Sequence, residues 1–145
     1  MTLLELIIAS SILIILASAA LPVSRMAIKR QKEIELQEAL REMRGAIDRY
    51  KDAADRGLIQ VELGTEGYPK DLDILVEGVE LATAKERRLR FLRRIPLDPM
   101  TGRADWGLRS VQDDPKSTSW GGQNVFDVYS RSNGVAINGT RYAEW

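Results

Sequence analysis

The chain opens with an apolar run, residues 3–23, in which Glu5 is the only charged side chain. As an α-helix, about twenty residues rise about 30 Å, which matches the hydrocarbon thickness of a bilayer. Such a run must either cross a membrane or be enclosed by other apolar surfaces. We therefore treat residues 1–24 as a transmembrane or otherwise enclosed helix.

Three interpretations of Glu5 compete. A secretory signal peptide would explain the Ala-Ser-Ala context at residues 17–19, but it requires basic residues before the apolar run, and there are none. An ordinary membrane anchor would place a lone carboxylate near hydrocarbon, at a cost of about 2.5–3.5 kcal/mol at the helix centre. The third interpretation gives Glu5 a cationic partner, the α-amino group of Met1 in the same or a neighbouring copy.

The composition argues against an enzyme. The 145 residues contain no histidine and no cysteine, which excludes a histidine general base, a thiol nucleophile, disulfides and zinc–thiolate sites. Lysine plus arginine equals aspartate plus glutamate, 21 of each, so no net charge draws the chain to nucleic acid. We expect a protein that is not an enzyme and does not bind nucleic acid.

Residues 25–56 are expected to continue the helix, with a kink or local unwinding at Pro22 because proline cannot donate a backbone hydrogen bond. Gly57 is the expected stop. One narrow apolar stripe, at spacings of four and three, predicts the face that packs on the rest of the protein: Leu36, Leu40, Met43, Ile47 and Tyr50. The other faces carry charges of both signs, which suits contacts between copies.

Residues 57–145 are expected to form a globular loop and β-sheet region, so the fold class is α+β. We expect a helical turn at residues 72–75, a short helix at 82–92 and a type I turn starting at Asp98. Alternation predicts strands around Trp106 and at residues 124–130. Asn138-Gly139 predicts a hairpin with a type I′ turn. The strands are expected to form one small antiparallel sheet on the long helix, with residues 110–122 as a surface loop.

Several stretches resemble one family. The N-terminal "MTLLEL" followed by Pro22, then "FLRRIPLDPMTG" at residues 91–102, "FDVYSRSNG" at 126–134 and the final Trp145, are similar to the type IV pilin-like superfamily. Within it they resemble most the major (G-type) pseudopilin of type II secretion systems, since type IVa pilins usually close their C-terminal region with a disulfide. Met1 departs from the family's phenylalanine, so Met1 is either the processed residue or a translation start.

The resemblance implies a function. A prepilin peptidase would remove a leader and expose Met1, which becomes N-methylated, and Glu5 would neutralise the amine of an adjacent subunit. The stretch before Pro22 can melt in the family's filaments. The expected partners are copies of this chain, minor pseudopilins, the inner-membrane assembly platform, the peptidase and the lipid bilayer. The chain would reside in the bacterial inner membrane and then enter a filament that spans the periplasm.

Two alternatives stay open: an extracellular type IV pilus subunit, and a monomeric membrane-anchored periplasmic domain whose ligand meets the loop at residues 110–122. The basic segment at residues 85–94 is interpreted as a solvated face or a contact with Asp113 and Asp114 of a neighbour. The family often binds calcium in the loops after Tyr129. Here those loops offer neutral oxygens from Ser130, Asn133 and Asn138, carry Arg131 and Arg141 and lack an acidic cluster, so no cofactor is expected and calcium is the minor alternative.

Overall fold

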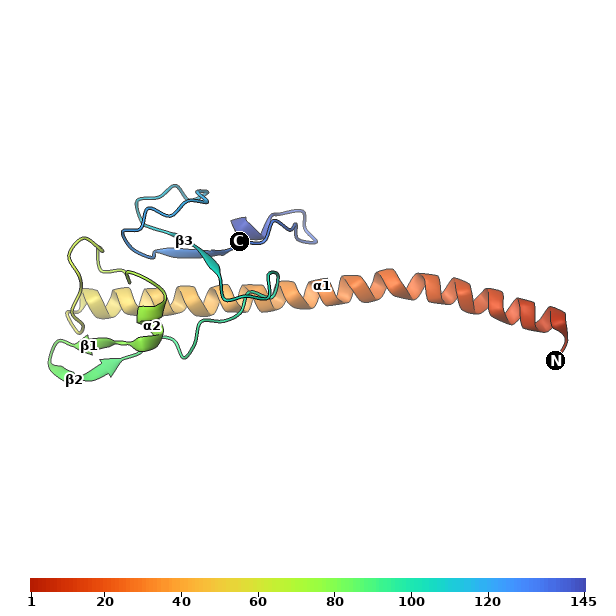
Figure 1. Ribbon diagram of the computed structural model, residues 1–145, viewed down its shortest axis with the longest axis horizontal. Coiled ribbons are helices and arrows are strands. Elements are labelled where there is room, and N and C mark those ends of the chain that lie inside the picture. Colours follow the sequence, from red (N-terminus) through yellow and green to blue (C-terminus); the bar gives the residue numbers. More distant parts are fainter.

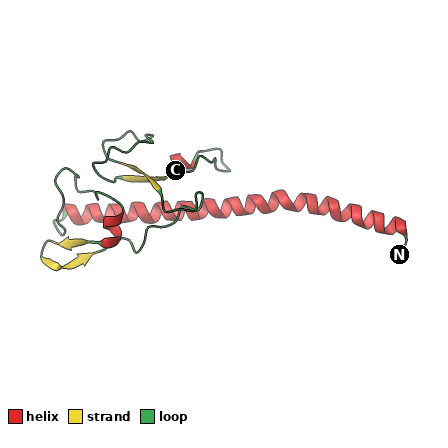
Figure 2. Ribbon diagram, in the orientation of Figure 1, coloured by secondary structure: helices red, strands yellow, loops and turns green.

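The computed structural model describes all residues 1–145. It confirms the α+β class: one very long N-terminal helix is followed by a C-terminal part made of short strands, short helices and loops (Figures 1 and 2). In chain order the elements are α1 (Leu3–Asp55), α2 (Asp73–Glu77), β1 (Val79–Leu81), β2 (Ala84–Leu89), β3 (Trp106–Arg109), β4 (Asp127–Ser130) and the 3₁₀ helix η1 (Tyr142–Glu144).

Both ends of α1 are capped by the residues that the sequence offers. The hydroxyl of Thr2 accepts a 3.3 Å hydrogen bond from the Glu5 amide, which satisfies one of the free donors of the first turn. At the other end Gly57 adopts a left-handed conformation with φ of 66°. The amides of Gly57 and Leu58 bond back to carbonyls of the last turn at 3.0 and 2.9 Å, the pattern of a Schellman motif. The predicted helix end is confirmed.

Pro22 does not interrupt α1 in the single subunit. The helix is continuous from Leu3 to Asp55, and its axis bends gently in the red and orange part of Figure 1. A proline removes one backbone hydrogen bond, which a helix of 53 residues tolerates when the turns on either side remain bonded. Melting near Pro22 on assembly stays a prediction.

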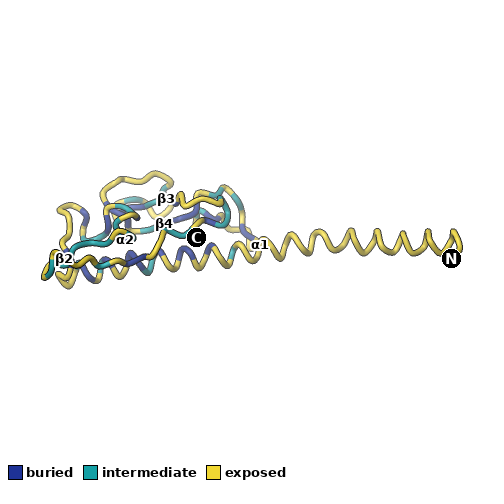
Figure 3. The backbone as a smooth tube through the Cα atoms, turned by 60° about the horizontal axis from the view of Figure 1, so that its bottom comes forward, coloured by how far each residue is buried: buried dark blue, intermediate teal, exposed yellow.

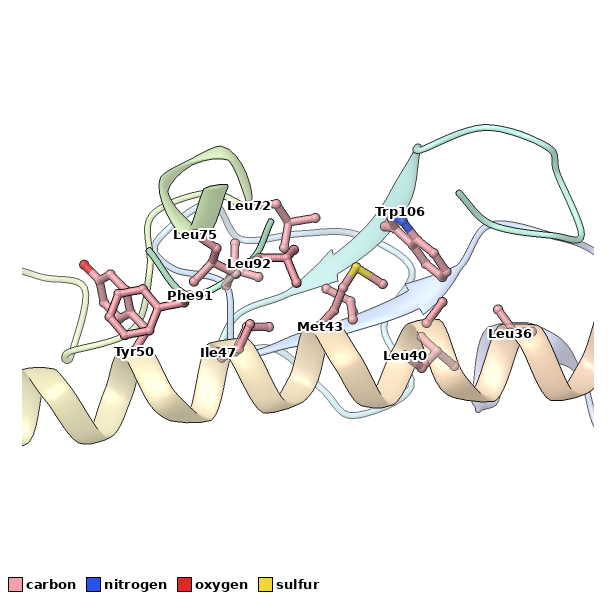
Figure 4. Close-up of a cluster of buried hydrophobic side chains, with 14 of the residues drawn as sticks. Leu36, Leu40, Met43, Ile47, Tyr50, Leu72, Leu75, Phe91, Leu92 and Trp106 are labelled. Atoms are coloured by element: carbon pink, nitrogen blue, oxygen red, sulfur yellow. The ribbon is translucent and has the colours of Figure 1, made fainter. Parts of the chain in front are cut away.

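The hydrophobic core lies along the second half of α1. The predicted stripe is buried, with Leu36, Met43 and Ile47 fully so, and it faces α2 and the strands (Figure 4). The alanines that flank the stripe are buried as well, so α1 contributes a broader surface than the narrow stripe. On the other side the core is completed by Leu72, Leu75, Phe91, Leu92, Trp106, Val125 and Val128.

The expected single sheet is replaced by two separate antiparallel pairs, β1 with β2 and β3 with β4. In the second pair Trp106 lies opposite Ser130, and Arg109 lies opposite Asp127. The prediction of a helix at residues 82–92 is wrong, because residues 84–89 form β2. Gly78, with φ of 85°, turns the chain out of α2, and the pairing with β1 then fixes this segment as a strand.

Two predicted turns are present but differ from the predicted type. A turn does start at Asp98, but the bond that closes it runs from the Gly102 amide to the Asp98 carbonyl at 2.7 Å, one residue longer than the predicted type I turn. The hairpin at Asn138-Gly139 is also present, but its type I′ turn is wrong, since Asn138 does not have positive φ. The amide of Gly139 bonds to the Ala136 carbonyl at 3.0 Å, and Gly139 alone has φ of 87°. This is a three-residue loop, in which only the glycine has to be left-handed.

Candidate functional site

The most unusual surface of the molecule is the first part of α1, residues 1–32, which we call the shaft; residues 33–145 are the head. Every residue of the shaft is exposed, as the yellow stretch in Figure 3 shows. The apolar part of the shaft has a mean hydropathy of 2.5 over an 18-residue window, and no part of that window is buried. α1 is the one helix long and apolar enough to cross a membrane. A helix of this kind is compatible with membrane anchoring.

Glu5 lies on the shaft's first turn without a charge partner. Its backbone amide bonds to Thr2, but its carboxylate forms no hydrogen bond or ion pair within the chain. Apolar neighbours surround it, among them Leu4 and Ile8, and with Thr2 they line a shallow groove of about 390 Å³. A carboxylate in apolar surroundings is costly unless a cation or a hydrogen-bond donor meets it.

The three residues singled out in the sequence do not form one site within a subunit. Met1 is 97% exposed and does not fold back onto Glu5, so pairing within one chain is not formed. Pro22 lies seventeen residues beyond Glu5, which is about 26 Å along a helix axis. The structure therefore shows no contact between Met1 and Glu5 within one chain, and their pairing across two copies stays a prediction.

The shaft joins the head at Glu33, a residue that the sequence analysis did not single out. One carboxylate oxygen of Glu33 accepts hydrogen bonds from the Ile137 amide and the Tyr142 hydroxyl, both at 2.9 Å. Burial, and then the bond to Glu33, raise the pKa of Tyr142 to about 12. Glu33 is one of many charged residues on α1, and no local signal distinguishes it from the others.

On the N-terminal side of Glu33, an open groove of about 650 Å³ separates the shaft from the C-terminal loop. Val23, Met26 and Arg30 line it on the shaft side, and Ile137 and Trp145 line it on the head side. The C-terminal loop thus extends past Glu33 and lies over the C-terminal end of the shaft.

Two arginines hold the C-terminal segments together. The Arg109 guanidinium donates to the carbonyls of Ser117 at 2.8 Å and Ala143 at 3.2 Å, and lies 3.5 Å from an Asp127 oxygen. It also stacks over the Tyr129 ring, 4.0 Å from its centre. Arg109 is buried, so these contacts join the loop at residues 110–123, β4 and the end of the chain.

Arg44 provides the matching contact from α1. Its guanidinium bonds to Asp127 Oδ1 at 2.7 Å, to the Val128 carbonyl at 3.1 Å and to the Trp145 carbonyl at 2.6 Å. Asp127 is shared by Arg44 and Arg109, so one carboxylate links α1, β3 and β4.

The residues named for calcium do not fit that ion. The Ser130 hydroxyl donates to Asp98 at 2.6 Å, and the Asn138 oxygen accepts from the amide and the hydroxyl of Thr140. The second Asp98 oxygen accepts from the Met100 amide. No group of three or more acidic side chains converges anywhere in the chain.

No protein family, curated protein or solved structure matches this chain. A long apolar N-terminal helix followed by small antiparallel sheets is compatible with a pilin-like fold, and to that extent the expected resemblance is confirmed.

The basic segment at residues 85–94 lies on and after β2, at the end of the molecule opposite the N-terminus (Figure 1). Its six cations are exposed, and none forms an ion pair within the chain: Lys85, Arg87, Arg88, Arg90, Arg93 and Arg94.

The loop at residues 110–122 is ordered by its own hydrogen bonds. Asp113 accepts from the amides of Ser110 and Gly121 at 2.8 and 3.0 Å, and these bonds lower the pKa of Asp113. Neither Asp113 nor Asp114 pairs with the basic segment of the same chain.

Proposed function

We propose that this chain is a structural subunit that polymerises into a helical type IV pilus-like filament, the pseudopilus of a type II protein secretion system. The observation that supports this proposal most is the shaft. It is long, apolar and wholly exposed in the single subunit, with one unpartnered carboxylate on its first turn. Packed side by side, shafts of many copies would exclude water from about twenty apolar residues each.

Glu5 has a specific role in this proposal. As a subunit leaves the membrane, its Glu5 carboxylate meets the N-terminal amine of Met1 on the neighbouring subunit. Two opposite charges attract strongly where water is excluded, and removing either leaves the other uncompensated. The pair therefore sets the axial position of one shaft against the next. N-methylation of Met1 leaves the amine cationic and so preserves the attraction.

The life of the subunit has two stages. The shaft first spans the inner membrane, with the head in the periplasm, after a prepilin peptidase has removed a leader before Met1. It then moves into the filament core, and the heads coat the outside. Melting near Pro22 lets the shaft lengthen in the filament. The work comes from a partner ATPase acting through the assembly platform, with minor pseudopilins as further partners, and the chain itself catalyses nothing.

Electron microscopy of material sheared from cells that overproduce the chain tests the proposal. We expect filaments, and an intact subunit mass one methyl group above that of the chain starting at Met1. The Glu5→Gln variant keeps the shape of the side chain but loses its charge, so it should enter membranes normally and yield few filaments. Glu35→Gln is the matched control, because Glu35 is also exposed and its only hydrogen bond is to Gln31 of the same helix.

Three results would contradict parts of this scheme. Equal filament yield from Glu5→Gln would reject the charge pairing. Filaments of unmethylated subunits would reject the N-methylation of Met1. Monomers alone, in detergent, would reject assembly and favour a membrane-anchored periplasmic domain.

A further inference from the structure

The charges of α1 are sorted along its axis. The upper end of the shaft, residues 24–32, carries four cations and no acid, and we call these four the basic collar: Arg25, Lys29, Arg30 and Lys32. The next ten residues reverse the balance, with one cation, Arg41, among four acids: Glu33, Glu35, Glu38 and Glu42. The sign of the charge thus changes between Lys32 and Glu33, where the shaft meets the head.

The basic collar has no partner within the subunit. All four side chains are exposed, and none forms a hydrogen bond or an ion pair. Toward the other end of α1, by contrast, Arg44 and Lys51, and Arg56 just after the helix, each pair with a carboxylate of the same chain. Folding of the head therefore does not require the collar, and its charge is available to something outside the subunit.

The position of the collar defines what it would meet in a membrane. It directly follows the apolar run that ends at Val23, and it precedes Glu33, which hydrogen-bonds with the C-terminal segment. The nine residues between them rise about 13 Å. The headgroup layer on each side of the hydrocarbon is about 5–8 Å deep. With residues 3–23 across the hydrocarbon, the collar begins in the headgroup layer at Arg25 and extends a few ångström beyond it. The long side chains of Lys29, Arg30 and Lys32 can reach back to the lipid phosphates, and the head begins just above them.

We propose that the basic collar binds the headgroups of anionic phospholipids while the subunit is in the membrane. Arginine binds phosphate through two parallel hydrogen bonds and lysine through a compact charge, and basic residues next to a membrane span are attracted by anionic lipids. The acids that follow are repelled by the same surface. The change of sign at Glu33 therefore fixes how deep the shaft sits and keeps the head off the bilayer. This inference rests on the membrane stage of the proposed function and is independent of polymerisation.

Native mass spectrometry of the full chain tests this directly. The protein is reconstituted into vesicles of equal parts phosphatidylglycerol and phosphatidylcholine, and the lipids that remain bound after release are counted. We expect the wild type to retain mainly phosphatidylglycerol. The collar variant, with all four cations changed to glutamine, should lose that preference at least several-fold.

A matched control removes the same charge elsewhere. Arg87, Arg88, Arg93 and Arg94 are exposed at the far end of the head, and changing all four to glutamine lowers the net charge equally. Arg90 is left in place because its side chain packs next to Gly78, where an added Cβ would come within 2.8 Å of it. This variant should keep the phosphatidylglycerol preference of the wild type. Thermal unfolding of both variants checks that the head is intact.

The outcomes separate this inference from the proposed function. Equal lipid preference in wild type and collar variant would overturn the inference. So would loss of preference in the control alone, which would place the lipid at the basic segment. A collar variant with unchanged lipid preference but few filaments would assign the collar to contacts between subunits instead. Failure of the wild type to float with vesicles would contradict the membrane stage itself.

Discussion

The Tyr142 hydroxyl donates a 2.9 Å hydrogen bond to the Glu33 carboxylate, across 109 positions of the chain. The Ile137 amide donates to the same carboxylate oxygen. The C-terminal segment is thereby fastened to α1 at the point where the helix leaves the head. Tyr142 also packs edge-on against Trp145, with ring centres 5.3 Å apart, so the fastening includes the last aromatic residue.

Removing the Tyr142 hydroxyl should loosen this fastening. We expect Tyr142→Phe to lower the free energy of unfolding by about 1.5–3 kcal/mol, the usual range for a hydrogen bond to a charged group. Hydrogen exchange at the Ile137 amide should become faster. Tyr129→Phe is the control, because it removes a bond to the Thr118 carbonyl at another place in the head. Unchanged exchange at Ile137 in Tyr142→Phe would contradict the proposed fastening.

Alkaline pH should weaken the fold through the same residue. The pKa of Tyr142 is raised to about 12 from the ordinary value of 10.0, so between these values the unfolded chain loses its tyrosine proton more readily. The stability that Tyr142 contributes is complete below pH 10 and is lost as pH rises through 12. Burial also raises the pKa of Tyr50, which adds a loss of the same sign. Between pH 8 and pH 12 the melting temperature should fall less steeply with pH for Tyr142→Phe than for the wild type. Identical slopes would contradict the contribution assigned to Tyr142.

Gly107 should not tolerate a side chain. A Cβ at this position would overlap the ring of Tyr129, which lies across the backbone of β3. We expect Gly107→Ala to lower the free energy of unfolding by about 1–3 kcal/mol, as overpacking usually does. Gly45→Ala is the contrasting control. Gly45 is inside α1, and a Cβ added there would lie 3.4 Å from its nearest neighbour, a guanidinium nitrogen of the flexible Arg49 side chain. Alanine should therefore raise the free energy of unfolding by about 0.5–1 kcal/mol. Denaturation of the full chains in detergent measures both, and a rise in stability for Gly107→Ala would contradict the ring placement.

Calcium should not change the thermal stability of the head. Because the oxygens of Ser130 and Asn138 are already hydrogen-bonded within the head and no acidic side chains converge there, neither excess calcium nor a chelator should shift the melting temperature. Arg109→Gln should lower the free energy of unfolding by about 2–3 kcal/mol, since it removes charged bonds to Ser117 and Ala143. Stabilisation of the wild type by calcium, reversed by the chelator, would show that the loops do form a cation site.

The sequence predicts best those features whose causes are local. The spacing of Leu36, Met43 and Ile47 identifies the buried face of α1, and Gly57 marks its end, because both depend on one helix alone. The strand β2 was missed because residues 82–92 contain good helix formers and no proline. Its conformation is decided by pairing with β1 after the left-handed turn at Gly78, which is a tertiary effect.

In the candidate site, too, the sequence identifies residues with a local signal and misses those defined by distant contacts. Glu5 stands out because a carboxylate in an apolar run is rare. Its lack of a partner in the subunit is compatible with the prediction that it pairs with a neighbouring copy. Glu33 and Arg44 could not be found, since their partners lie 83 to 109 positions away, and helix spacing carries no information about such contacts. The partner proposed for Glu5 lies in another molecule, so its identification rests on the resemblance and not on a contact within the chain.

None of the first 32 side chains is buried within the subunit. Substitutions among them therefore leave the folding of the head almost untouched, whereas substitutions along the stripe from Leu36 to Tyr50 act on it directly. The two parts of one continuous helix are therefore under different selective pressures. The stripe is constrained by the stability of the head, and the shaft is constrained by the molecules that surround it. Across divergent copies of this gene, we expect the shaft to change in step with its lipids and neighbouring subunits, and the stripe to change in step with the head.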